Sequence, residues 1–157
     1  MELVCRHPFS GNIKSKASKP PKGRFAHENS VISKYAVDFP VPLGTPVLAV
    51  KNGIVIMAKY DSGTHYSPES VEKMTKKEIE ALSEKYTNVV AINHGEGFFT
   101  EYGHLSKRRV VRVGQKVAEG DVIGYVGMTG ITSEPHVHIN AFTIENKQVK
   151  SIPIRFV

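Results

Sequence analysis

Short apolar runs, separated by glycine, proline and polar turns, recur along most of this sequence. Several alternate between apolar and polar positions and are rich in valine and isoleucine, as β-strands with one buried face are. We expect strands at residues 35–39, 46–50, 53–58, 88–92, 98–102, 110–113, 122–126 and 137–139. The pattern predicts an all-β fold, mainly antiparallel, with a curved sheet of the barrel-sandwich hybrid type and a short helical insertion.

One connection between these strands carries a specific turn signal. Lys51, Asn52 and Gly53 separate the runs 46–50 and 53–58. Asn-Gly between two apolar runs is the strongest short signal for a β-hairpin. We therefore expect these two strands to pair with each other.

Residues 61–87 interrupt the strand pattern with a polar segment rich in Glu and Lys. Thr75 and Glu78 have the spacing of a capping box, which marks the start of a helix. A broken apolar stripe of helical period follows the same segment, at Val71, Met74, Ile79, Leu82 and Tyr86. The segment is predicted to be a helical insertion whose stripe packs on the sheet, or lines a substrate groove as the alternative.

Length and the position of the turn-forming residues define the expected domain organisation. Residues 1–24 are expected to form an irregular arm, because their later part combines Ser, Lys and Gly with the pair Pro20-Pro21. Residues 25–157 are then one domain, which is the size that supports a single core. No apolar stretch has the length of a membrane span, and residues 1–10 lack the apolar run of a signal peptide, so we expect no stable membrane insertion.

The net charge of +6 favours an anionic partner, which could be nucleic acid, a membrane surface or a cell-wall polymer. The basic residues are scattered and are not interleaved with aromatic residues, so we expect no nucleic-acid binding. Cys5 is the only cysteine, which excludes an intramolecular disulfide.

The candidate chemistry centres on His136 and His138, which occupy alternate positions of an expected strand and so point to the same face. A hydrolytic zinc ion needs three protein ligands and an open position for water, and two histidines with one carboxylate are such a set. Asp38 is the leading carboxylate because it lies in an apolar run, where an unpaired charge is costly. A turn residue before Pro40 is its alternative interpretation.

The order of several motifs resembles that of the lysostaphin-type (LytM-like) zinc peptidases, which cut bacterial peptidoglycan. The resemblance extends over roughly residues 25–140, with the insertion as its interruption. It is carried by His27 and by the segments 35–39, 42–47, 88–94, 101–105, 113–124, 127–130 and 135–138.

This resemblance implies one Zn²⁺ ion per chain, held by His27, Asp38 and His138. It also implies that His136 and His104 flank the open position of the metal. One imidazole there would take a proton from the attacking water, and the other would donate a hydrogen bond to the oxyanion. We favour His136 as the base because it shares a strand face with His138.

The chain departs from the resemblance at one ligand. The compact form of the family has a histidine four residues before the aspartate, where this chain has Lys34. His27 lies eleven residues before Asp38, so the intervening loop has to bring it back to the metal. His7 is the other upstream candidate and ranks behind His27.

The resemblance implies a zinc-dependent endopeptidase that hydrolyses amide bonds in peptidoglycan peptides, and a secreted or cell-envelope location. We expect a monomer. A non-catalytic wall- or hydrolase-binding module of the same fold is one alternative. A lipoyl-type carrier or phosphocarrier is another, although Lys116 is poorly placed for a lipoyl group. His94 and His65 are interpreted as a hydrogen-bonded turn residue and a solvated loop residue.

Overall fold

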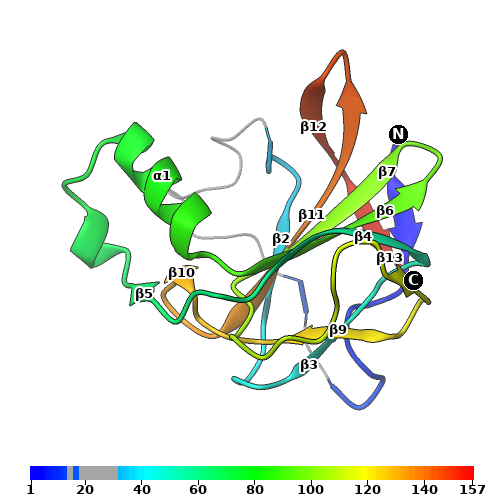
Figure 1. Cartoon of the computed structure of the whole chain (residues 1–157), viewed down its shortest axis with the longest axis horizontal. Helices are drawn as coiled ribbons and strands as arrows, with labels where there is room; N and C mark the ends of the chain where they lie inside the picture. The colour runs from blue at the N-terminus through cyan, green and yellow to red at the C-terminus, as the bar shows by residue number, and fades with distance from the viewer. Residues whose placement is uncertain (14–15, 18–31) are drawn as a thin grey trace.

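The computed structural model describes residues 1–13, 16–17 and 32–157. Within them, the body of the fold is a seven-stranded sheet in the order β12–β11–β7–β6–β4–β8, with β2 also paired to β11 (Figure 1). All its strand pairs are antiparallel, which confirms the predicted fold class. The strands are β2 (Val37–Pro40), β4 (Gly53–Lys59), β6 (Val89–Gly95), β7 (Phe98–Gly103), β8 (Lys116–Val117), β11 (His136–Glu145) and β12 (Gln148–Ile152).

Pairs of short strands form separate two-stranded sheets around it. The antiparallel pair β3 (Pro46–Leu48) and β9 (Val122–Tyr125) lies across its buried face. The parallel pair β5 (His65–Tyr66) and β10 (Gly130–Ile131) joins the first part of the insertion to a segment later in the chain. The parallel pair β1 (Leu3–Cys5) and β13 (Ile154–Phe156) joins the two ends of the chain.

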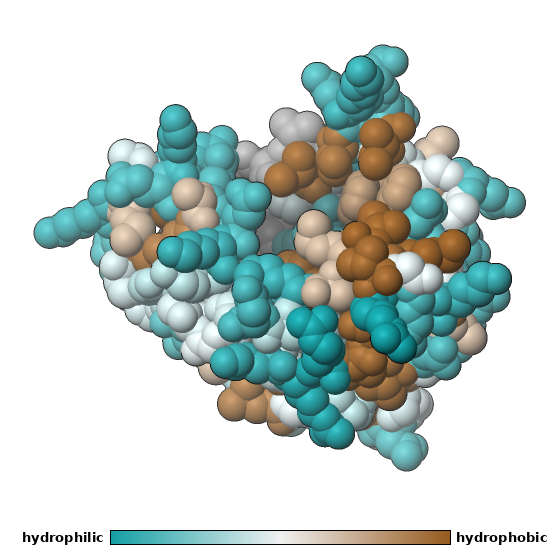
Figure 2. Space-filling view, in the orientation of Figure 1, coloured by the Kyte–Doolittle hydropathy of each residue, from teal (hydrophilic) through white to brown (hydrophobic). Residues whose placement is uncertain are grey.

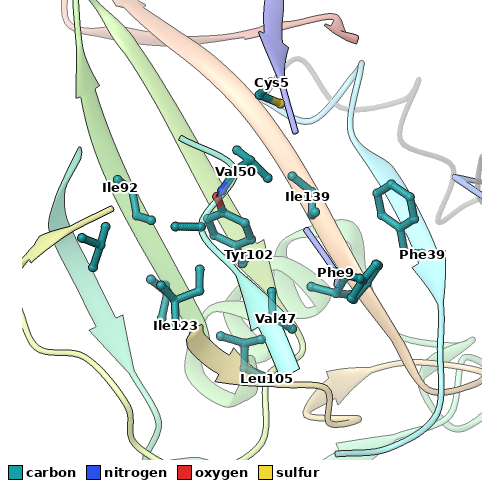
Figure 3. Packing of buried hydrophobic residues seen from close by; sticks show 14 of the residues in the cluster. Cys5, Phe9, Phe39, Val47, Val50, Ile92, Tyr102, Leu105, Ile123 and Ile139 are labelled. Carbon is teal, nitrogen blue, oxygen red and sulfur yellow. Dashed lines mark hydrogen bonds between the residues drawn. The ribbon is translucent and has the colours of Figure 1, made fainter. Parts of the chain in front are cut away.

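The hydrophobic core fills the space between the seven-stranded sheet and the β3–β9 pair (Figure 3). Alternate residues of the long strands, such as Ile92, Tyr102 and Ile139, are completely buried on one face of the sheet. Val47 and Ile123 meet them from β3 and β9. Burial of each such side chain stabilises the fold by about 1.5–3 kcal/mol. The opposite face of the sheet is left to carry polar and functional side chains.

The prediction of a hairpin at Asn52 and Gly53 is wrong, because β3 pairs with β9 whereas β4 pairs with β6 and β8. Gly53 is instead required by a close approach of two strands, since a Cβ there would lie 2.5 Å from the carbonyl oxygen of Asn93. Asn52 accepts a hydrogen bond from the backbone of Glu119 at 2.7 Å. The strand expected at 110–113 is also absent from the described structure, which has β8 a few residues later.

The insertion contains a 3₁₀ turn (Glu69–Val71) and the helix α1 (Lys76–Tyr86). The capping box is confirmed, with Thr75 and Glu78 exchanging two hydrogen bonds of 3.2 Å. No residue of α1 is buried, and the helix lies against β10 and away from the large sheet (Figure 1). The prediction that the apolar stripe packs on the large sheet is therefore wrong. Instead, the Tyr86 ring of α1 lies 5.7 Å from the Tyr66 ring of β5. Among the described helices, none has the length and hydrophobicity to span a bilayer.

The beginning of the chain differs from the expected irregular arm. Leu3 and Cys5 of β1 are buried in the core together with Phe9. Burial raises the pKa of the Cys5 thiol to about 12, which keeps it protonated and unreactive at neutral pH. Most of the remainder of residues 1–24 lies outside the described residues.

A chain of hydrogen bonds crosses the core from Val50 to His94. The Val50 amide donates to the Tyr102 hydroxyl at 3.0 Å, and the hydroxyls of Tyr102 and Thr100 are 3.2 Å apart. Thr100 lies 2.7 Å from Nε2 of His94, whose Nδ1 lies 2.7 Å from the carbonyl oxygen of Asn52. The Thr100 hydroxyl donates to the Tyr102 hydroxyl, which also accepts from the Val50 amide. At the other end, the carbonyl of Asn52 can only accept, so Nδ1 of His94 carries a proton.

This network predicts a pH-dependent stability. Burial lowers the pKa of His94, so the unfolded chain binds the proton more tightly than the native state does. The free energy of unfolding is expected to fall as the pH drops below about 6.5, by at most about 1.4 kcal/mol per pH unit from this group. Urea titrations between pH 7.5 and 5 should show a shallower decline for His94→Gln. An unchanged slope in that variant would contradict the role of His94.

Candidate metal and catalytic site

The pairing of β2 with β11 brings the two predicted ligands within the described residues together. Asp38 lies directly opposite His138 in the register, on the face of the sheet that turns away from the core. Oδ1 of Asp38 is 3.2 Å from Nδ1 of His138 and 3.8 Å from Nε2 of His136. The three side chains retain 11–17% of their exposure, so the cluster is shielded yet open to a small molecule.

His104 joins this cluster from the residue after β7, whose last residue, Gly103, pairs with His138. Its ring centroid lies 4.7 Å from that of His136 and 6.1 Å from that of His138. The backbone of His104 has φ of 64°, in the left-handed region that non-glycine residues rarely adopt. The amide of Gly127 holds this conformation by donating to the carbonyl of His104 at 3.0 Å. Such strain is concentrated at functional sites.

Backbone carbonyls fix the proton positions of the two flanking histidines. Nδ1 of His136 lies 2.9 Å from the carbonyl oxygen of Glu134, and Nδ1 of His104 lies 2.7 Å from that of Thr129. A carbonyl only accepts, so each Nδ1 carries a proton. In the neutral rings Nε2 is therefore bare and can take a proton.

Burial, together with the neighbouring rings of His136 and His138, lowers the pKa of His104 to about 3. The ring is neutral at physiological pH, and its Nε2 can accept but not donate a hydrogen bond. The expected donation of a hydrogen bond to an oxyanion would require His104 to gain a proton first. In this state the ring is suited to accept a hydrogen bond at Nε2.

Residues that the sequence did not single out position His104. The buried Thr129 supplies the carbonyl that orients the ring, while its hydroxyl donates to the carbonyl of Leu105 at 2.8 Å and accepts from the amide of Asn88 at 3.0 Å. Asn88 is completely buried and exchanges two hydrogen bonds with the backbone of Ser62. The group that orients His104 is the backbone carbonyl of Thr129. Because every residue has such a carbonyl, the sequence gives little indication of this role.

The described donors fit a zinc ion. Two ligands of a tetrahedral zinc lie roughly 3.4 Å apart, given metal–ligand distances of about 2.0–2.2 Å. The separation of 3.2 Å between Asp38 and His138 is close to that edge. His27, the third ligand implied by the resemblance, lies outside the described residues.

The other histidines in the described part lie outside the cluster. His7 packs 6.1 Å from the ring of Phe39 and 5.2 Å from that of Phe156. Phe39 points to the opposite face of β2 from Asp38, so this position disfavours His7 as a ligand. His65 lies in β5 with Nε2 3.0 Å from the carbonyl oxygen of Thr132, and His94 belongs to the core network.

The sequence profile of Peptidase family M23 matches residues 32–151. The Peptidoglycan DD-endopeptidase ShyA of Vibrio cholerae is 28% identical, over 94% of this chain and 31% of its own length. An uncharacterized metalloprotease of Haemophilus influenzae is 31% identical, over 96% of this chain and 23% of its own length. This chain thus spans less than a third of the length of these relatives.

Solved structures share the fold. A putative peptidase M23 from Pseudomonas aeruginosa is 27% identical and superposes with a TM-score of 0.56 over 95% of this chain and 45% of its own. The catalytic domain of lysostaphin from Staphylococcus simulans, 24% identical, gives a TM-score of 0.57 over 89% of both chains. Because the family profile covers most of the sequence and these folds agree with it, the chain belongs to peptidase family M23.

Proposed function

We propose that this chain is a zinc-dependent endopeptidase that hydrolyses amide bonds in the peptide stems or cross-bridges of peptidoglycan. The observation that carries the proposal is the convergence of Asp38 and His138 with two histidines, His136 and His104, whose Nδ1 protons point to backbone carbonyls and leave Nε2 as the proton acceptor of each ring. A non-catalytic relative would have no need of those proton acceptors beside the ligands. The four described side chains come from one chain, so a monomer suffices for this part of the site.

His27, Asp38 and His138 would hold the ion, which when bound acidifies a water and polarises the substrate carbonyl. Nε2 of His136 takes a proton from the attacking water, while Glu134 keeps the imidazole in the required tautomer. Nε2 of His104 accepts the second hydrogen bond of that water and so orients it. The protonated His136 then delivers its proton to the amine that leaves.

The surrounding surface suits an extended, anionic substrate. Figure 2 shows the surface hollowed between the lobe that carries α1 and the hairpin of β11 and β12. The net charge of +6 favours approach to an anionic wall. The insertion therefore has the position of a groove wall, the alternative expected from its apolar stripe.

The experiment that tests this function uses zinc-loaded protein and purified peptidoglycan of several wall types. Mass spectrometry of the released fragments should find new amine termini in peptides, and the zinc content should be one ion per chain. Released sugars with intact peptides would contradict amide hydrolysis. Stable, metal-free protein that binds the wall without cutting it would instead support the binding module.

A further inference from the structure

Glu101 lies in the middle of β7, on the same face of the sheet as the proposed metal ligands. It is directly opposite Asn140 of β11, while Gly103, two residues further along β7, is opposite His138. Glu101 and His138 are therefore diagonal neighbours, whose Cα atoms are about 7–8 Å apart in antiparallel sheets. A carboxylate thus lies on the face of the sheet that carries the proposed metal ligands, one diagonal step from His138.

The side chains directly opposite Glu101 on the sheet make no hydrogen bond to its carboxylate. Within the part of the chain that the structure describes, no hydrogen bond or ion pair reaches its side chain. Asn140 directs its amide nitrogen to the carbonyl of Ile32 and its oxygen to the hydroxyl of Ser151, and no hydrogen bond joins it to Glu101. Ala91, opposite on β6, has no polar side-chain atom to offer.

The environment of Glu101 is also poorly hydrated. The stacked rings of Phe99 and Phe142, 5.2 Å apart, occupy the next row of the same face. The Glu101 side chain is only partly exposed. A half-buried carboxylate that makes no hydrogen bond is costly, and a cation that binds there offsets the cost.

We propose that Glu101 determines substrate specificity by binding a primary ammonium group one or two residues from the bond that is cut. The inference rests on the proposed peptidase function. An extended peptide advances about 3.3–3.6 Å per residue, so the diagonal step from His138 to Glu101 spans about two residues. Stem peptides offer such amines on diamino-acid side chains that are not cross-linked, which makes them the substrate group that fits.

The test compares peptidoglycan with free amines against the same material treated with acetic anhydride, which converts each ammonium into a neutral amide. Acetylation should lower kcat/KM of the wild-type protein about tenfold or more, mainly through KM. Glu101→Gln should cut both preparations at similar rates, near that of wild type on acetylated material. Glu96→Gln, in the exposed β6–β7 turn, makes the same change of charge and should behave as wild type.

The zinc content and thermal midpoint of each variant establish that it is folded and loaded. Equal wild-type rates on the two preparations, or an equal loss on both in Glu101→Gln, would overturn the proposal. If the wild type cuts neither preparation, the proposed peptidase function is wrong. Cosedimentation of the protein with each preparation then tests the amine site at Glu101 separately. Wild type should then bind the untreated material more tightly than the acetylated material, with that preference lost in Glu101→Gln. Binding without such a preference refutes the amine site.

Discussion

Replacement of His138 by alanine is expected to remove bound zinc and to lower peptide-bond hydrolysis by about three orders of magnitude or more. The substitution deletes one of two described donors whose separation of 3.2 Å matches an edge of a zinc tetrahedron. Without this ligand the proposed zinc ion is lost, and with it the acidification of the attacking water and the polarisation of the substrate carbonyl. Metal analysis of the purified variant and fragment release from peptidoglycan measure the two effects.

The same variant should remain folded, because His138 points away from the core that stabilises the sheet. Its far-ultraviolet circular dichroism and cooperative thermal unfolding should match those of chelator-treated wild-type protein. His65→Ala is the matched control, since it removes an imidazole outside the cluster and should keep both zinc and activity. Zinc retained by His138→Ala would contradict the ligand assignment. Cooperative unfolding of the wild type on chelation would indicate a structural metal instead.

Replacement of His136 or His104 by asparagine is expected to leave zinc in place and to lower kcat by about 10²–10⁴-fold. The asparagine amide can still donate to the carbonyl of Glu134 or Thr129 that each ring contacts. It lacks the bare ring nitrogen that takes a proton. Zinc content, KM and kcat, measured together, separate this loss from a loss of the metal.

The two variants also discriminate between the roles of the histidines. The larger loss is expected in His136→Asn, because His136 is the proposed base and His104 orients the water. A larger loss in His104→Asn would reverse the two roles. If either variant loses its zinc, that histidine belongs among the ligands. Wild-type activity in either variant would remove that residue from the mechanism.

Strand periodicity was sufficient to predict much of the site. Alternation along the strand predicted that His136 and His138 share a face, and the apolar setting of Asp38 marked a carboxylate in need of a partner. The structure places these side chains together because β2 pairs with β11. The capping box at Thr75 and Glu78 was also predictable, since it depends on residues three apart.

Features that depend on distant contacts were not predictable. The Asn52-Gly53 pair has the local signature of a turn, yet Gly53 serves the close approach of a strand forty residues away. The pairing of β1 with β13 joins opposite ends of the sequence, so no local pattern reveals it. Glu101 resembles any alternating polar residue until the register places it beside His138.

Asp38 and His138 are a hundred residues apart in sequence, and this separation orders the events of folding. Closure of so long a loop is slow and is repaid only when the intervening strands have assembled. The proposed metal site is therefore complete only after nearly all of this domain has been synthesised. Under the proposed function, binding of the ion is a late step of maturation, and a partly synthesised chain lacks activity.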